Sequence, residues 1–563
     1  MNFEDAKKEL MNLQNKSSAY DHAVALIYYD GVTGAPKGTA ENRANTLSVI
    51  SEEMYKISTS PETVQLLEYL DSCIHPAASG AASGSQPNSS MSSSVSNIAA
   101  TTAAAGASYP EGFDPASFDP ESDEGRKLDR MVYLLLKDIR FMQKIPMDEF
   151  IAYQELLVLS DDVWHKAKEA SDFALFQPYL EKIFETQKRF AHYAAPDKDP
   201  YDYWLNEYEP GLNKKTCDQF FDTFRARLVP LIKEITSAQQ VDDSFMWGDF
   251  PEYKQDILSH YLMDLIGLDS EHVGLSVTEH PFTTSLGSHL DVRITTNYKK
   301  DNFAASMYSV IHEGGHALYD TGCARDLAYT VLDRGVSMGI HESQSRFYEN
   351  LLGRSKGFTS YVLPKIRELF PEAMKDVTPD QFYKAINLSQ PSLIRTEADE
   401  VTYCLHVMIR YELEKRVMAG ELEVKDLPTE WNRLYKEYLR LDVPDDKRGV
   451  LQDFHWAGGL IGYFPSYALG SAYGAQFLHK MKETVDVDKC LADGNFAPIN
   501  EWNRSHIWQY GSLYTPEQLL DRVFGEPFDP NYYMEYLENK YREIYGAGKY
   551  MEVNNLAGIT PSS

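Results

Sequence analysis

The stretch DNFAASMYSVIHEGGHALYDTG, residues 301–322, combines a helical pattern with two histidines four positions apart. Asp301 is predicted to cap the amino end of this helix, and Gly322 supplies a stop at its carboxyl end. Residues four apart share one helix face, with about 5–6 Å between their Cβ atoms. His312 and His316 are therefore predicted to reach one metal ion from the same helix.

The residue after the first histidine is Glu313, which completes an H-E-x-x-H pattern. In zinc peptidases this glutamate lies beside the metal, where it acts as a base for the bound water. Gly314 and Gly315 each cost roughly 0.5–1 kcal/mol inside a helix, so the pair indicates a close approach to that face. The pattern also arises by chance, so other ligands must support it.

A catalytic zinc site keeps three protein ligands and one open position, so a third ligand is required. The segment GVSMGIHESQSRFYENLLG, residues 335–353, predicts a second helix with three candidates, His341, Glu342 and Glu349. Glu342 is preferred, partly on the resemblance described below and partly because it completes a set of two histidines and one glutamate. His341 could instead be a hydrogen-bonding partner of a ligand, and Glu349 lies two turns further along.

The composition is typical of a soluble globular protein: of 563 residues, 43% are hydrophobic and 25% charged. The formal net charge of −30 argues against nucleic-acid and anionic-membrane partners, which attract lysine and arginine. The five cysteines are scattered without C-x-x-C spacing, which favours reduced thiols. With no secretory signal and no membrane-spanning apolar run, a cytoplasmic location is expected.

Most of the sequence has the three- and four-residue apolar spacing of helices, for example at residues 129–145 and 402–418. The best strand signal is HLDVRITTNY, residues 289–298, where Val292 and Ile294 alternate with polar side chains. These patterns predict a mostly α fold with one small sheet near that strand.

One segment, residues 74–125, is dominated by Ser, Ala and Gly. It offers too little apolar surface to offset the entropy of ordering it. We expect a disordered insertion between two helices, because long surface loops add little closure entropy. Apart from this insertion, residues 1–563 are expected to form a single domain.

Five motifs resemble those of the Taq-type metallocarboxypeptidases, peptidase family M32. In chain order they are DVRIT (291–295), HEGGH (312–316), HESQ (341–344), IRTEAD (394–399) and GVLQDFHW (449–456). Three flanking segments are similar as well, EYEPGL (207–212), EHPFTTS (279–285) and GYFPSYALG (462–470). The similarity runs from about residue 20 to residue 546, apart from the insertion, which departs from the family pattern.

The resemblance implies a large helical, gluzincin-like catalytic domain with a deep groove, a small β-sheet at the groove wall and homodimeric assembly. It also implies a zinc-dependent carboxypeptidase that releases single residues from the C-terminus of peptides. By matching the family's motifs to this sequence, the resemblance implies that His312, His316 and Glu342 are the zinc ligands. It also implies that Glu313 is the base that activates the metal-bound water. Cobalt or manganese could replace zinc, because geometry selects weakly among these ions.

Recognition of a free C-terminus calls for a cation that binds a carboxylate bidentately, which is the property of arginine. Arg395 in IRTEAD is the leading candidate. The alternative for Arg395 is a surface salt bridge with Glu397 or Asp399. Arg293, on the predicted strand, is a second positive group that could instead orient the strand.

The segments GVLQDFHW (449–456) and GYFPSYALG (462–470) contain a histidine and two tyrosines that could donate hydrogen bonds. Water attack on a peptide carbonyl creates an oxyanion, which a histidine or tyrosine can stabilise beside a zinc ion. His455 and Tyr467 are assigned to carboxylate binding or oxyanion stabilisation, with the division between them open. Tyr463 could share this role or be a core residue.

Two other functions stay open at this point. An oligopeptidase or dipeptidyl carboxypeptidase would share the helical groove and the metal chemistry, but it would not release single residues. A non-catalytic metal-binding or peptide-binding protein would need Glu313 to be replaced, and Glu313 is present. The G-A-M-E-N motif of aminopeptidases is absent, which counts against N-terminal trimming.

Overall fold

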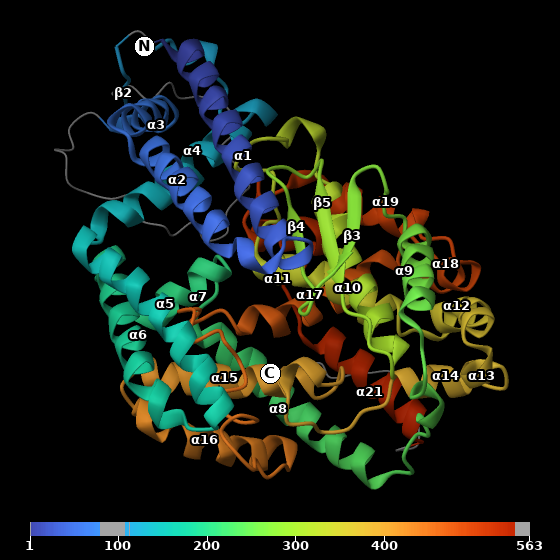
Figure 1. The fold of residues 1–563 in the computed structure, drawn as a ribbon. Helices are drawn as coiled ribbons and strands as arrows, with labels where there is room; N and C mark the ends of the chain where they lie inside the picture. Colours follow the sequence, from blue (N-terminus) through green and yellow to red (C-terminus); the bar gives the residue numbers. More distant parts are fainter. Residues whose placement is uncertain (1, 79–106, 112, 547–563) are drawn as a thin grey trace, which may run out of the picture.

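The computed structural model describes residues 2–78, 107–111 and 113–546, which are mostly helical (Figure 1). The helices before the main sheet are α1 (Phe3–Thr33), α2 (Ala40–Thr59), α3 (Pro61–Ile74), α4 (Asp123–Lys144), α5 (Met147–Ala170), α6 (Phe173–Ala194), α7 (Pro200–Tyr208), α8 (Lys214–Ser237) and α9 (Glu252–Ile266). Those after it are α10 (Phe303–Thr321), α11 (Met338–Arg346), α12 (Lys356–Leu369), α13 (Pro371–Met374), α14 (Pro379–Ile386), α15 (Tyr403–Met418), α16 (Leu427–Leu434), α17 (Pro465–Met481), α18 (Val487–Asp493), α19 (Ala497–His506), α20 (Pro516–Phe524) and α21 (Asn531–Tyr545).

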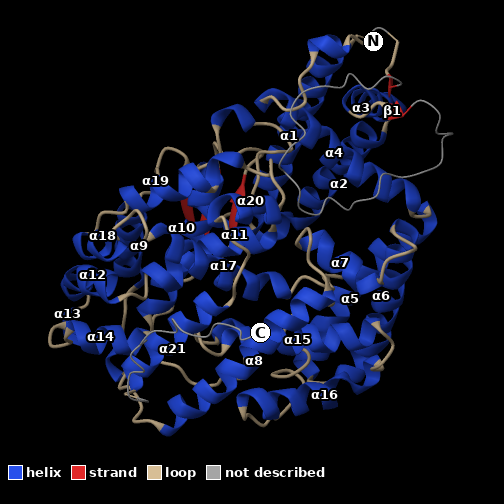
Figure 2. Ribbon diagram, turned by 180° about the vertical axis from the view of Figure 1, so that it is seen from behind, coloured by secondary structure: helices blue, strands red, loops and turns tan. Residues whose placement is uncertain are grey.

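The main sheet has three strands, β3 (Val273–Val277), β4 (Thr283–Ser285) and β5 (Val292–Thr296), in the order β3-β5-β4. The central strand β5 runs parallel to β3 and antiparallel to β4. It lies within the predicted strand 289–298, and its Val292 and Ile294 are fully buried. The prediction of a mostly α fold with a small sheet at this place is therefore confirmed (Figure 2).

The sheet lies beside the helices that carry the sequence motifs. β5 and β4 pack against α10, α10 packs against α11, and α11 packs against α17 (Figure 1). Because these elements are joined by one continuous cluster of buried apolar side chains, the motif residues are held on a rigid support.

A second, smaller apolar cluster lies under α1, α3 and α4. It includes Leu327, Leu332 and Leu513 from the larger part of the chain, so the amino-terminal helices pack onto the rest of the protein. No helix among the residues that the structure describes is both long and apolar enough to cross a membrane.

The insertion is predicted at about residues 74–125. Residues 79–106 and 112, which include most of the Ser/Ala/Gly-rich part, lie outside the described residues. The flanks are structured: β1 (Ala77–Ala78) pairs with β2 (Ala107–Ser108), and α4 begins at Asp123. The reason for the early start of α4 is Ser122, whose side chain accepts a hydrogen bond from Gly125 N–H and caps the helix.

Candidate active site

Helix α10 carries both histidines of the H-E-x-x-H pattern. Its amino end is capped by Asn302 rather than by the predicted Asp301, because the Asn302 side chain accepts a hydrogen bond from Ala304 N–H at 2.9 Å. Its carboxyl end is at Gly322, as predicted. The rings of His312 and His316 lie on one face, with centroids 5.0 Å apart.

Glu342 of α11 faces this pair. Its Oε2 lies 3.6 Å from His316 Nε2 and 3.9 Å from His312 Nε2. Among the described residues, these three form the one group whose ligand atoms are close enough to share a metal ion, all within 4.8 Å of one another. Separations of this size suit one ion at about 2.0–2.2 Å from each atom.

In both histidines Nε2 faces Glu342, and the other ring nitrogen, Nδ1, has a hydrogen-bonding partner. His312 Nδ1 lies 2.8 Å from Glu349 Oε2, and His316 Nδ1 lies 2.6 Å from His341 Nδ1. Outer partners of this kind fix the ring orientation of metal-binding histidines. The two alternative ligands from the sequence, His341 and Glu349, therefore lie behind the histidine rings instead of beside Glu342 Oε2.

Glu349 reaches His312 from a π-helical turn, Phe347–Leu352, that follows α11. Single π-helical turns are rare and often occur at functional sites. Arg354 Nη2 donates to Glu349 Oε1 at 3.3 Å, so this carboxylate is held from both sides.

Arg346 orients Glu342. Its Nε donates to Glu342 Oε1 at 2.7 Å, so Oε2 is left to face the two histidines. Burial opposes ionisation of Glu342, but Arg346 and the histidines outweigh it and hold the pKa of this carboxyl well below its usual range. Glu342 is therefore an ionised, preoriented acceptor.

The electrostatic potential between His312, His316 and Glu342 favours a bound cation. Burial opposes a charge on His312, but the hydrogen bond to Glu349 and the nearby Glu342 and Glu313 carboxylates raise its pKa to about 9. Carboxylates that stabilise a protonated imidazole also stabilise a divalent ion at the same point. Two imidazole nitrogens and one carboxylate oxygen are a donor set that suits zinc.

Close helix packing explains the glycines around Glu342. A Cβ atom on Gly315 would lie 2.6 Å from Gln344 O of α11, and one on Gly470 of α17 would lie 2.7 Å from Glu342 Cβ. A Cβ on Gly314 would lie 2.6 Å from Ile266 Cδ1. The close approach inferred from the glycine pair is thus made by neighbouring helices and side chains.

Glu313 is buried next to the histidines and is held by the sheet. Thr283 of β4 donates its hydroxyl to Glu313 Oε2 at 2.6 Å and lies 3.0 Å from the Glu313 carbonyl oxygen. The strand therefore fixes both the helix turn and the side chain of the predicted base.

Arg395 is buried, at 6% exposure, in a polar cluster with Asp453. Its Nε donates to Asp453 Oδ1 at 2.9 Å, and Arg410 Nη2 donates to Asp453 Oδ2 at 2.6 Å. The alternative of a surface salt bridge with Glu397 or Asp399 is wrong, because Arg395 is buried and forms its ion pair with Asp453. Asp399 instead accepts hydrogen bonds from Ser389 and Thr402.

Tyr403 connects this cluster with the histidine site. Its hydroxyl accepts from Arg395 Nη1 at 3.3 Å, and its ring centroid lies 4.1 Å from Arg346 Cζ. The guanidinium that orients Glu342 and the guanidinium predicted to bind substrate thus contact the same side chain.

His455 and Tyr467 lie beside Arg395. His455 Nε2 is 3.1 Å from Tyr467 Oη, and the Tyr467 ring centroid is 5.0 Å from Arg395 Cζ. Burial, with Arg395 and Arg410, lowers the pKa of His455 to about 3, so this ring is neutral. Tyr463 packs edge-on against Tyr467 at 5.1 Å between centroids, and burial with nearby Glu342 raises its pKa to about 12.

Arg293 lies in a different place. Its Nε and Nη2 donate to Asp291 at 2.7 and 3.1 Å, and its Cζ is 6.0 Å from the Tyr29 ring centroid. These contacts join β5 to α1 and favour the strand-orienting interpretation of Arg293.

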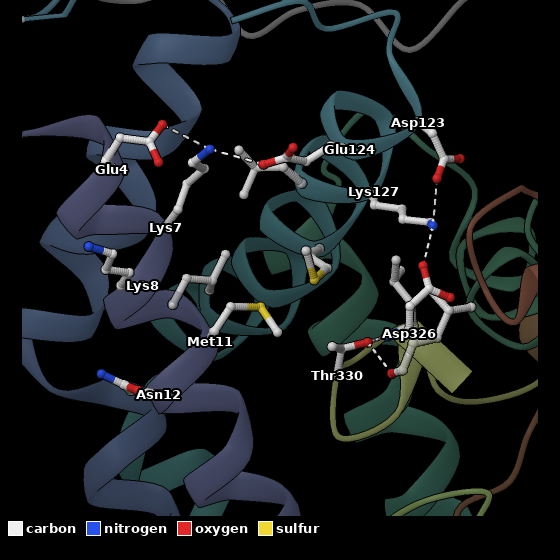
Figure 3. Close-up of a pocket in the computed structure, with 15 residues that line it drawn as sticks. Glu4, Lys7, Lys8, Met11, Asn12, Asp123, Glu124, Lys127, Asp326 and Thr330 are labelled. Atoms are coloured by element: carbon white, nitrogen blue, oxygen red, sulfur yellow. Dashed lines mark hydrogen bonds and ion pairs between the residues drawn. The ribbon is translucent and has the colours of Figure 1, made fainter. Parts of the chain in front are cut away.

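A cavity of about 570 Å³ lies between α1, α4 and the loop after α10, and none of the predicted site residues lines it (Figure 3). Most charges on its rim are paired with one another: Lys7 with Glu4 and Glu124, and Lys127 with Asp123 and Asp326, while Lys8 forms no ion pair with a described residue. It is therefore a poor candidate for the active site.

The sequence analysis did not predict the roles of Thr283, Arg346, Tyr403 and Asp453, or that of Asp320, whose Oδ1 lies 2.9 Å from His341 Nε2. Arg346 had a local signal, since it follows Glu342 by four residues on one helix. The other four reach their partners from elements distant in the sequence or had no distinctive spacing.

Comparisons with known proteins identify the family of this chain. The family model "Carboxypeptidase Taq (M32) metallopeptidase" matches residues 9–541. Carboxypeptidase 1 of Bacillus subtilis is 38% identical over 541 residues, covering 96% of this chain and 98% of that protein. Thermostable carboxypeptidase 1 of Thermus thermophilus is 40% identical over 398 residues, covering 69% and 78%. A solved M32 carboxypeptidase from Deinococcus radiodurans superposes with a TM-score of 0.85 at 31% identity, covering 96% of this chain and 100% of that one.

Proposed function

The chain belongs to the carboxypeptidase Taq (M32) metallopeptidase family and is a metallocarboxypeptidase that acts on peptides, and we propose that it is zinc-dependent and removes one residue at a time from the C-terminus. The observation that carries this proposal is the convergence of His312 Nε2, His316 Nε2 and Glu342 Oε2. We propose these three side chains as the metal ligands.

The donor set fits a zinc ion, for the reasons of charge and geometry given above. A bound divalent ion would supply Lewis-acid activation of a water molecule and of the scissile carbonyl. The remaining chemistry falls to residues of this chain.

Glu313 is the proposed base. Thr283 occupies its Oε2, so we assign proton transfer to Oε1. This oxygen takes a proton from the attacking water and then delivers a proton to the nitrogen of the leaving amino acid.

Tyr467 is the proposed oxyanion donor. His455 is neutral and carries one ring proton, and its Nδ1 is buried without a hydrogen-bond partner among the described residues. Placing the proton on Nε2 lets it donate to Tyr467 Oη, which frees the Tyr467 hydroxyl hydrogen for the developing oxyanion. Tyr467 also lies three residues before Gly470, which packs on Glu342, so it is on the side of α17 that faces the site.

Arg395 is the proposed anchor for the substrate carboxylate. One carboxylate, Asp453, is shared by two guanidinium groups, which leaves Arg395 with hydrogen-bonding capacity. Its Nη2 has no hydrogen bond to any described residue, which suits an incoming C-terminal carboxylate. Anchoring the terminus here fixes which peptide bond lies next to Glu313.

A peptide digest followed by mass spectrometry tests the proposal against an oligopeptidase or dipeptidyl carboxypeptidase. We expect a ladder of products that differ by single C-terminal residues, lost on chelation and restored by zinc or cobalt. Release of dipeptides or internal fragments would contradict the single-residue cut, and metal binding without hydrolysis would indicate a non-catalytic binding protein.

Three further proposals come from the family resemblance and the sequence. They are a single catalytic domain, a homodimer and a cytoplasmic location. Sedimentation of the full chain at micromolar concentration tests the second, since a monomer under those conditions would contradict it.

A further inference from the structure

Glu209, in the EYEPGL segment just after α7, has no part in the chemistry described above. Its side chain is 2% exposed, and it forms no salt bridge with any described residue. A buried carboxylate without a cationic partner is costly unless several donors surround it. Its contacts therefore call for an explanation.

The donors come from the first turn of α11. Gly339 N–H donates to Glu209 Oε2 at 2.8 Å, and the Ser337 hydroxyl donates to Glu209 Oε1 at 2.9 Å. Ser337 Oγ in turn accepts from Ile340 N–H at 3.1 Å. Two amides that lack partners within the helix are thus satisfied by Glu209, one directly and one through Ser337.

The contact is tight and involves a second helix. A Cβ atom on Gly339 would lie 2.7 Å from Glu209 Oε2, so a larger residue there would displace the carboxylate. Tyr473 of α17 lies 3.5 Å from Glu209 Oε1 through its hydroxyl, and α17 also presents Gly470 to Glu342. Glu209 therefore ties the start of α11 to the helix against which Glu342 packs.

We propose that Glu209 is a positioning residue that fixes the first turn of α11 and so places Glu342, three residues after Gly339, opposite His312 and His316. This inference rests on the proposed function, in which Glu342 is a metal ligand. It assigns the EYEPGL segment to the assembly of the metal site, although the segment contacts neither histidine.

Burial raises the pKa of Glu209 to about 7, so the test is done at pH 8, where this carboxylate is mostly ionised. The titratable groups that face it are neutral at that pH: Tyr473 of α17, Tyr319 of α10 and Cys217 of α8. A change in zinc binding at pH 8 then reports on Glu209 itself.

The experiment measures zinc affinity of the full-length protein by competition with a chromophoric chelator. Glu209→Gln keeps the size of the side chain but removes its charge and one acceptor, and we expect zinc to bind about tenfold more weakly. The matched control is Glu207→Gln, two residues away, where the carboxylate pairs with Lys137 instead; it should bind zinc within about twofold of wild type.

A second pair of variants tests the same contact from the helix side. Gly339→Ala should weaken zinc binding like Glu209→Gln, whereas Gly38→Ala, with no atom within 4 Å of the added Cβ, should not. Unfolding midpoints of the metal-free proteins separate positioning from folding. If Glu209→Gln binds zinc within twofold of wild type, the positioning role of Glu209 is overturned, whether or not the variant is less stable, and the proposed function is unaffected. If the wild-type protein does not bind zinc, the proposed function is overturned as well.

Discussion

The Nδ1 atoms of His316 and His341 lie 2.6 Å apart, and His341 Nε2 lies 2.9 Å from Asp320 Oδ1. Because an ionised carboxylate only accepts, a neutral His341 carries its proton on Nε2, and its Nδ1 then accepts from His316 Nδ1–H. His316 Nε2 is then left with a lone pair that faces Glu342. Asp320 is fixed in turn by the Ser285 hydroxyl at 2.8 Å, so the tautomer of His316 is set from the sheet.

Asp320→Asn should weaken zinc binding by about tenfold, because the amide can donate as well as accept and no longer dictates the tautomer of His341. Chelator competition on the full chain measures this. Asp326→Asn serves as the control, since Asp326 is exposed and pairs with Lys127. Equal affinities for Asp320→Asn and wild type would show that the relay has no influence on the metal site.

Glu313→Gln should bind zinc as wild type does but lower kcat by roughly 100-fold to 10⁴-fold, because the amide cannot accept the proton of the attacking water. Steady-state hydrolysis of a short peptide, together with the zinc content of the same sample, checks both halves of the prediction. Activity close to wild type would exclude Glu313 as the base.

Tyr467→Phe should lower kcat by about 100-fold with little change in KM, because the hydroxyl is used only when negative charge develops on the carbonyl oxygen. Tyr463→Phe is the comparison, since its ring lies beside Tyr467 but has no hydrogen bond to His455 among the described residues. A larger loss of kcat in Tyr463→Phe would transfer the oxyanion role to that residue.

Arg395→Ala should reduce kcat/KM for a free-acid peptide by roughly 100-fold, the cost of removing one partner of a charged hydrogen bond. A C-terminally amidated peptide of the same sequence should lose much less. Asp453 keeps its bonds to Arg410, so the variant is expected to fold. Equal losses for the acid and the amide would mean that Arg395 has a structural role.

The sequence was most informative where the relevant contacts are local. The spacing of His312 and His316 determines their common face on α10, and the alternation at Val292 and Ile294 correctly located the central strand. Glu342 lies on the next helix of the same motif set, and the structure brings it to the two histidines.

The spacing of residues along the sequence could not predict contacts between elements that are distant in the chain. Nothing in the spacing of Thr283 indicates that β4 would present it to Glu313, or that Asp453 would be the partner of Arg395 in place of Asp399. The π-helical turn that directs Glu349 to His312 has no sequence signature, because it depends on packing against α10 and α17. These side chains are placed by the tertiary fold, which local periodicity does not encode.

The central claim is that His312, His316 and Glu342 hold one catalytic metal ion. Anomalous diffraction at the zinc edge, from crystals grown with zinc, tests it most directly. We predict a single strong peak at about 2.0–2.2 Å from His312 Nε2, His316 Nε2 and Glu342 Oε2. A peak elsewhere, or one from which Glu342 points away, would contradict the account.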